Sequence, residues 1–298
     1  MNQHKELENQ PEYRSFLKTA LAFKGSATPK VIKKVTISIL YSCLVSYLCY
    51  FFPSAILPIG PFEYGGLIMG LILVFRVNAG YDRWWEARKL WGNIVNQSRN
   101  LTIILVNYTH PDAQSWLVKM TNLISALPYL MKDNLRNQTQ LEYLDHLLGM
   151  ENRQQIQEAM HRPMILASMI AHELQIARNH HGLDSFAFLR AQEQIGHLID
   201  AQGACERILK TPMPFVMAVK SRRFILFFLV MLPFALANVS LFLSPLIAAI
   251  VSYAIFSLDQ IGIELQNPFS EKNLSHLALD KICKTIENDI KEIRRHVE

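Results

Sequence analysis

Three stretches without charged residues dominate the pattern of hydrophobic positions along the chain, at residues 35–52, 64–75 and 224–258. The first, at about 18 residues, approaches the ~20 residues that cross a bilayer core as a helix. The third would be ~50 Å long as one helix, which exceeds the ~30 Å core. It should therefore fold as a hairpin that turns within residues 238–245. The pattern predicts an all-α membrane protein with four transmembrane helices.

A long polar block separates the second and third stretches, and its apolar positions follow helical rather than strand periodicity. We therefore expect a large helical domain here and an amphipathic helix in the tail. The predicted organisation is an N-terminal segment in 1–34, transmembrane helices 1 and 2 in 35–78, a helical domain in 79–223, transmembrane helices 3 and 4 in 224–265, and a C-terminal helix in 266–298. The inward positions expected in the tail are Leu277, Leu279, Ile282, Ile286 and Ile290.

Basic residues indicate the orientation of these helices. Lysines and arginines flank the apolar stretches on one side, whereas the two turns on the opposite side contain neither residue. The positive-inside rule then places both termini and the helical domain in the cytoplasm. We expect the protein to lie in the inner membrane of a bacterial cell. The net charge of +5 fits cytoplasmic flanks that face anionic lipid. Nucleic-acid binding is not expected, because no basic stripe with interleaved aromatic residues is present.

The sequence lacks the patterns of common catalytic and metal sites. The four cysteines have no C-x-x-C spacing, and His172, His180 and His181 have no second set of ligands at a metal-binding spacing. A nucleophile elbow, a phosphate loop and a dinucleotide fingerprint are also absent. We therefore predict no enzyme, no metal site and no cofactor.

The second apolar stretch carries the most distinctive spacing. Leu67, Leu71 and Phe75 recur every fourth residue, so they form one stripe on a helix. Such a stripe is typical either of ordinary helix packing or of a surface that lines a pore. Charged and tryptophan-rich sequence follows at once, beginning with Arg76.

That following sequence resembles the bacterial branch of the bestrophin family. The resemblance covers roughly residues 15–295, and its most specific part lies directly after the second span. The matching residues are Phe75-Arg76, Asn78, Tyr81-Asp82-Arg83-Trp84-Trp85-Glu86, Arg88-Lys89-Leu90-Trp91, Ser98-Arg99-Asn100 and, after the last span, Asn267-Pro268-Phe269.

The resemblance implies a homopentameric ion channel with one central pore. The family's hydrophobic neck, formed by three apolar residues one helical turn apart, matches Leu67, Leu71 and Phe75. A second, cytoplasmic constriction is also implied, and the helix around residues 170–176 is our candidate for it. Animal members pass chloride, whereas bacterial relatives are associated with monovalent cations, so the selectivity stays open. The structural motif of the family matches Arg76, Asn78, Asp82, Arg83, Trp84 and Trp85.

The sequence departs from the animal members after Asn-Pro-Phe. Those members carry an acidic cluster that binds calcium, whereas Ser270, Glu271, Lys272 and Asn273 stand at the matching positions here. One carboxylate beside a lysine does not supply the six to eight oxygen ligands that calcium takes. We therefore expect no calcium regulation.

Several charged residues allow two interpretations. Glu63 either contributes one carboxylate per subunit to a ring of five at the outer mouth of a pore, where it would attract cations, or is a solvated loop residue. Arg76, Asp82, Arg83 and Glu86 either face the permeation path or form ion pairs between helices and between subunits, and we favour the ion pairs.

Two other classes of membrane protein compete with a channel. A secondary transporter is disfavoured, because no inverted repeat is present and no charged residue lies at mid-span to couple an ion. A non-conducting scaffold is the second alternative. Only a channel would dissipate an ion gradient across empty liposomes quickly and without a coupling ion.

Overall fold

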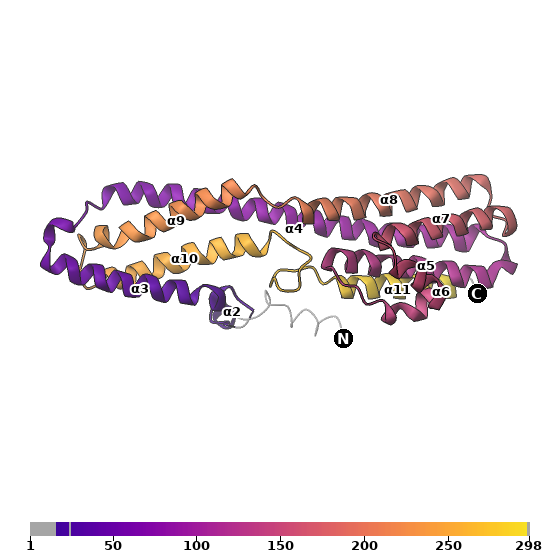
Figure 1. Ribbon diagram of the computed structural model, residues 1–298, viewed down its shortest axis with the longest axis horizontal. Coiled ribbons are helices and arrows are strands. Elements are labelled where there is room, and N and C mark those ends of the chain that lie inside the picture. Colours follow the sequence, from indigo (N-terminus) through magenta and orange to yellow (C-terminus); the bar gives the residue numbers. More distant parts are fainter. Residues whose placement is uncertain (1–15, 24, 297–298) are drawn as a thin grey trace. The chain divides into compact units, whose positions relative to one another are not determined.

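The computed structural model describes residues 16–23 and 25–296, so residues 1–15 and residue 24 of the predicted N-terminal segment lie outside the described residues (Figure 1). Helices and short 3-10 turns are the regular structure present in this part of the chain. The helices are α2 (Phe16–Ala20), α3 (Thr28–Phe51), α4 (Gly60–Tyr108), α5 (Gln114–Arg136), α6 (Asp145–Gln157), α7 (Arg162–His180), α8 (Ser185–Lys210), α9 (Phe215–Leu236), α10 (Ser244–Glu264) and α11 (Leu279–Arg295).

The chain divides into two compact units. Unit 1 comprises Met1–Tyr81 and Met213–Gln266, and unit 2 comprises Asp82–Pro212 and Asn267–Glu298. Helix α4 contributes its first part to unit 1 and its second part to unit 2. Each unit has its own buried apolar core.

Unit 1 is a bundle in which α3, α9 and α10 pack side by side, together with the first part of α4 (Figure 1). Met69 and Leu73 of α4 are buried against Phe228 of α9 and Ile255 of α10. Gly65 of α4 lies so close to Phe228 that an added Cβ would stand 3.6 Å from the ring. Small residues at this point let the two helices approach each other.

The length and composition of the helices set limits on which of them can span a membrane. Among the described helices, α3, α4 and α10 are long and apolar enough to cross a bilayer. Helix α9 is not in this group, because Lys220, Arg222 and Arg223 lie in its first half. The hairpin predicted for residues 224–258 is present, since α9 ends at Leu236 and α10 begins at Ser244.

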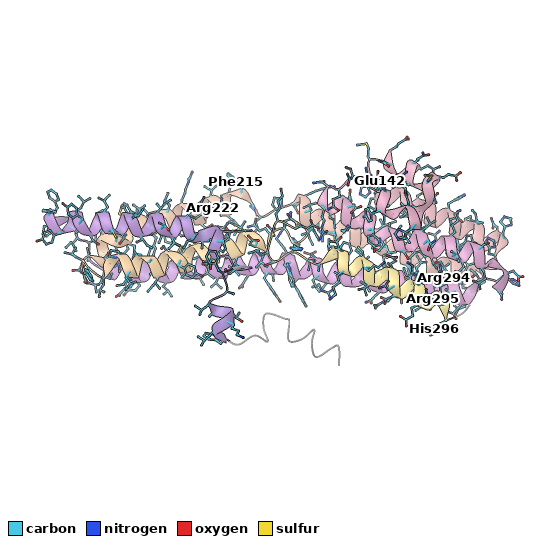
Figure 2. All side chains as sticks on the ribbon, turned by 90° about the horizontal axis from the view of Figure 1, so that it is seen from below. Glu142, Phe215, Arg222, Arg294, Arg295 and His296 are labelled. Atoms are coloured by element: carbon cyan, nitrogen blue, oxygen red, sulfur yellow. The ribbon has the colours of Figure 1, made fainter. Side chains whose placement is uncertain are left out.

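Unit 2 is built around α5, which packs against α6, α7, α8 and α11. Leu279, Ile286 and Ile290 of α11 are buried, as the amphipathic pattern predicts, and Ile282 is half-buried. Leu277 is also buried, but it precedes the helix, because the segment between Gln266 and Leu279 forms turns. Arg294 and Arg295 lie in the last turn of α11 (Figure 2), where positive charge interacts favourably with the helix dipole.

Candidate functional site

The apolar stripe of α4 lies on the surface of unit 1. Leu67, Leu71 and Phe75 are 74%, 54% and 62% exposed. They are one helical turn apart, so their side chains project from the same face of α4. Exposed apolar rows of this kind in a single chain mark a surface that faces lipid, a pore or another subunit.

The opposite face of α4 packs inside unit 1. Met69 and Leu73 are each 1% exposed and belong to the core that α9 and α10 complete. The stripe is therefore not needed for packing within unit 1, which distinguishes it from an ordinary core face.

Glu63 occupies the first turn of α4, and its side chain is exposed. A carboxylate in the first helical turn is favoured by the partial positive charge of the helix N-terminus. The carboxylate lies one turn before Leu67, so the charge stands at the end of the apolar stripe.

Arg76 directly follows the stripe, but its side chain is buried in unit 1. Its Nη1 atom lies 2.5 Å from Oδ1 of Asp259 on α10 and donates a hydrogen bond of 3.1 Å to Oγ of Ser221 on α9. Arg76 thus binds two neighbouring helices within unit 1. This geometry supports a structural role for Arg76 in preference to a place on the permeation path.

Arg83 caps the C-terminal end of α8 within unit 2. Its guanidinium donates to the backbone carbonyl of Thr211 at 2.8 Å and to that of Ile208. The last carbonyl groups of a helix have no partner inside the helix, so a cation that binds them satisfies hydrogen bonds and complements the dipole. Nearby, Glu86 pairs with Arg207 of α8 at 3.1 Å.

The two tryptophans after Arg83 differ in their contacts. The indole N–H of Trp84 donates to the carbonyl of Ser275 at 2.7 Å, which links α4 to the segment before α11. The rings of Trp84 and Trp85 stack with centroids 6.4 Å apart. Trp85 is exposed, as are Asn78 and Asp82, so these three motif residues present side chains at the surface of the chain.

The segment after Asn267-Pro268-Phe269 is organised by an arginine. The Nη1 atom of Arg136 lies 2.5 Å from Glu271 and 2.6 Å from Asp280, and Lys132 approaches Asp280 at 2.9 Å. Burial raises the pKa of the Asp280 carboxyl, but the hydrogen bonds from Arg136 and Lys132 outweigh burial and lower that pKa to about 2. The charge of Glu271 is thus compensated within the chain. Among the described residues, no group of three His, Cys, Asp or Glu side chains has a metal-binding arrangement.

A second charged cluster, centred on Glu287 of α11, was not predicted. Its carboxylate is 2% exposed and accepts hydrogen bonds from Tyr129 of α5 at 2.8 Å and from Lys291 at 2.6 Å. The Lys284–Glu287–Lys291 spacing signals ion pairs on one helix, but the sequence contains no signal for Tyr129.

The candidate for a second constriction lies on α7. Ile170 is fully buried in the core of unit 2, whereas Ile176 is half-buried. Of the two isoleucines, Ile176 is therefore the one whose side chain reaches the surface of the chain.

Known proteins are similar to this chain in both sequence and structure. Residues 7–292 match the family model described as "Bacterial/Fungal Bestrophin protein". The chain therefore belongs to the bacterial and fungal bestrophin family. The solved structure of a bacterial bestrophin homologue from Klebsiella pneumoniae is 26% identical, covers 89% of this chain and 98% of its own, and superposes with a TM-score of 0.83.

Two relatives extend this result to proteins named for their function. The voltage-dependent anion channel-forming protein YneE of Escherichia coli is 30% identical over 95% of this bestrophin and 93% of its own length. A Synechocystis protein of the same designation is 29% identical over 92% of this bestrophin and 90% of its own length. These relatives are named for channel formation and not for catalysis, which confirms the prediction of an ion channel rather than an enzyme.

Proposed function

We propose that this bestrophin forms a homopentameric channel that passes monovalent ions passively along its five-fold axis. The first part of α4 from each protomer would line the pore, and Leu67, Leu71 and Phe75 would form the hydrophobic neck. Rings of apolar side chains restrict permeation by dewetting and by the cost of dehydrating an ion.

The exposed stripe on α4 is the observation that carries this proposal. Leu67, Leu71 and Phe75 project away from the buried face that Met69 and Leu73 pack into unit 1. Arg76, the first charge after the stripe, is held inside unit 1 by Asp259, so it does not place its guanidinium beside the stripe. The neck would therefore be uncharged, and charges at its ends would influence which ions enter.

We place the channel in the bacterial inner membrane with four spans and both termini in the cytoplasm. The three candidate spans and the basic residues beside them support this topology. Helix α9 would be the fourth span, with Lys220, Arg222 and Arg223 in the cytoplasmic headgroup region and the uncharged residues 224–236 in the hydrocarbon. Long basic side chains reach the interface from such a position.

Purified protein in a planar bilayer under a potassium chloride gradient tests this function. A current with a defined reversal potential is the expected result. Movement of that potential toward the chloride equilibrium value would assign anion selectivity, as in the names of the relatives, and movement toward the potassium value would assign cation selectivity. Absence of current from both the natural protein and a Leu71→Ala variant would contradict the channel and favour a scaffold.

The pentamer has its own test. Native mass spectrometry of the detergent-solubilised protein should give a mass of five chains. A different stoichiometry would overturn the five-fold axis while leaving the bilayer measurement to decide on conduction.

A further inference from the structure

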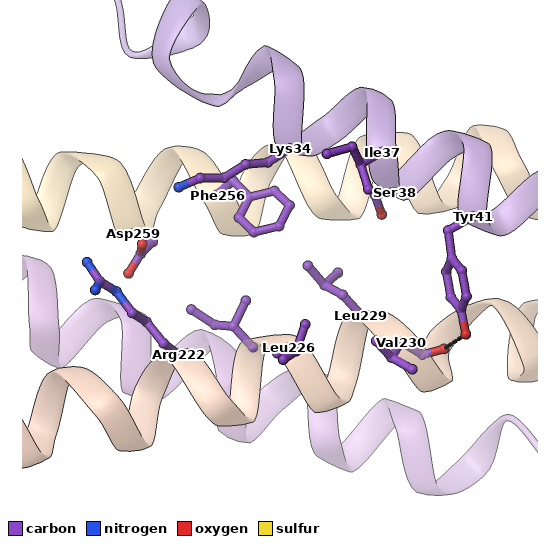
Figure 3. Close-up of a pocket in the computed structure, with 11 residues that line it drawn as sticks. Lys34, Ile37, Ser38, Tyr41, Arg222, Leu226, Leu229, Val230, Phe256 and Asp259 are labelled. Carbon is purple, nitrogen blue, oxygen red and sulfur yellow. Dashed lines mark hydrogen bonds between the residues drawn. The ribbon is translucent and has the colours of Figure 1, made fainter.

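A groove on unit 1 has the chemistry of a lipid site. It has a volume of about 420 Å³ and lies among α3, α9 and α10 (Figure 3). Its apolar walls include Ile37 of α3, Leu226 and Leu229 of α9, and Phe256 of α10. At one end, Lys34 of α3 and Arg222 of α9 bring two positive charges to the groove.

All three helices change from charged to apolar in the same direction along this groove. From Lys34 the α3 wall continues through Ile37 to Tyr41, and from Arg222 the α9 wall continues through Leu226 to Val230. Lys34 and Tyr41 are ~10 Å apart along the helix at 1.5 Å per residue. The far end is bounded by a hydrogen bond of 3.1 Å from the Tyr41 hydroxyl to the carbonyl of Val230.

The charged residues at the Lys34 and Arg222 end of the groove leave an excess of positive charge. Asp259 also lines the groove, but its carboxylate is already paired with Arg76 at 2.5 Å. Neither Lys34 nor Arg222 has an ion-pair partner within 4.0 Å among the described residues. The ammonium of Lys34 lies 5.6 Å from the centre of the Phe256 ring, which keeps this cation beside the apolar wall.

We infer that this groove binds an anionic phospholipid of the cytoplasmic leaflet. Lys34 and Arg222 bind the phosphate, Ser38, one turn deeper, offers a hydroxyl to the glycerol ester region, and one acyl chain lies between Leu226, Leu229 and Phe256. Basic pockets between membrane helices on the cytoplasmic side are suited to anionic headgroups. The inference rests on the membrane placement given in the proposed function, but not on conduction.

Neighbouring basic residues provide a matched control. Lys33 directly precedes Lys34, and Arg223 directly follows Arg222. Both residues are exposed and do not line the groove. The variants Lys34→Gln/Arg222→Gln and Lys33→Gln/Arg223→Gln therefore remove the same charge from the same helices. A third variant, Leu226→Trp, fills the apolar part and keeps both cations.

Native mass spectrometry of the intact protein, titrated with palmitoyl-oleoyl phosphatidylglycerol, measures the binding. We expect the groove pair to bind this lipid about 30-fold more weakly than the natural protein, from ~1 kcal/mol per basic residue. The control pair should bind nearly as well as the natural protein. Leu226→Trp should also weaken binding, because an acyl chain and not only a phosphate occupies the groove. Gel filtration and circular dichroism establish that each variant is folded.

Three outcomes would overturn the inference. Equal losses in both charge pairs would indicate general attraction of anionic lipid to a basic surface. Unchanged binding in the groove pair would remove the site. A groove variant that changes the number of chains per complex without changing lipid binding would show that a second copy of this chain covers the groove. None of these readouts depends on ion current, so the lipid site and the channel can fail separately.

Discussion

Arg76 of α4 and Asp259 of α10 form a buried ion pair in which 2.5 Å separates Nη1 from Oδ1 and the two side chains are 5% and 7% exposed. Ser221 of α9 accepts a further hydrogen bond from the same Nη1 atom. Charged groups in a low-dielectric interior are tolerated when each has a partner. The pair therefore joins three helices directly beside the apolar stripe that we propose as the neck.

Removing one member of this pair should destabilise unit 1. Arg76→Gln or Asp259→Asn is expected to cost about 3–5 kcal/mol, because the remaining charge stays buried without its partner. Arg223→Gln, which alters an exposed arginine of α9, is the control and should cost little. Thermal unfolding in detergent, followed by circular dichroism, measures the change.

The double variant Arg76→Met/Asp259→Leu separates the two charges' effects. It should be more stable than either single variant, because no unpaired charge remains. If the loss of unfolding free energy in the double variant equals the sum of the losses in the two single variants, the two side chains act independently.

Acid should weaken unit 2 in a defined pH range. Burial raises the pKa of Glu287, but hydrogen bonds from Lys291, Tyr129 and Lys284 outweigh burial and lower it to about 2, below the ordinary value of 4.5. The unfolded chain therefore binds more protons than the folded chain between these values. The stabilisation from Glu287 is fully present above pH 4.5 and is lost as the pH falls toward 2, and Asp280 acts in the same direction.

The variant Glu287→Gln should remove this part of the pH dependence. We expect the difference in melting temperature between the natural protein and the variant to shrink as the pH is lowered from 5 to about 2. Glu151→Gln, at an exposed position of α6, serves as the control. A difference that stays constant over this range would contradict the assignment.

The helices followed from the sequence because their signals are local. The apolar run at 35–52 and the turn residues of 238–245 predicted α3 and the α9–α10 hairpin. Helix α3 begins earlier than the run, at Thr28, because a helix can extend past the bilayer and Pro29 suits its first turn. Helix α4 continues without a break to Tyr108, since Gly80 and Gly92 are tolerated within it.

The partners of the charged residues did not follow from the sequence. Asp259 pairs with Arg76, and Tyr129 pairs with Glu287, across separations that no helical spacing relates. Arg136, which binds both Glu271 and Asp280, carried no distinguishing pattern. Tertiary packing determines these contacts. The spacing of charges along the sequence therefore predicts that ion pairs form, but it does not identify the partner of each residue.

Glu63 should influence which ions enter the pore. Five carboxylates at the outer mouth would concentrate cations, and Glu63→Gln would remove them. We expect the ratio of cation to anion permeability to fall, with the largest change at low salt, where the Debye length is longest. Reversal potentials under potassium chloride gradients at two overall salt concentrations measure this permeability ratio, and Glu151→Gln in unit 2 is the control. A permeability ratio that is the same in both variants would place Glu63 away from the permeation path.

Leu71 and Leu73 provide the sharpest test of the neck, because they lie on the same helix with opposite exposure. Leu71 is 54% exposed on the stripe, whereas Leu73 is 1% exposed in the core of unit 1. Leu71→Ala should widen and wet the neck, which raises the single-channel conductance with little effect on stability. Leu73→Ala should instead lower the free energy of unfolding by about 2–5 kcal/mol, because it leaves a cavity in the core. Single-channel recording and thermal unfolding of both variants distinguish the two roles. An unchanged conductance in Leu71→Ala, or the same conductance increase in both variants, would remove Leu71 from the neck.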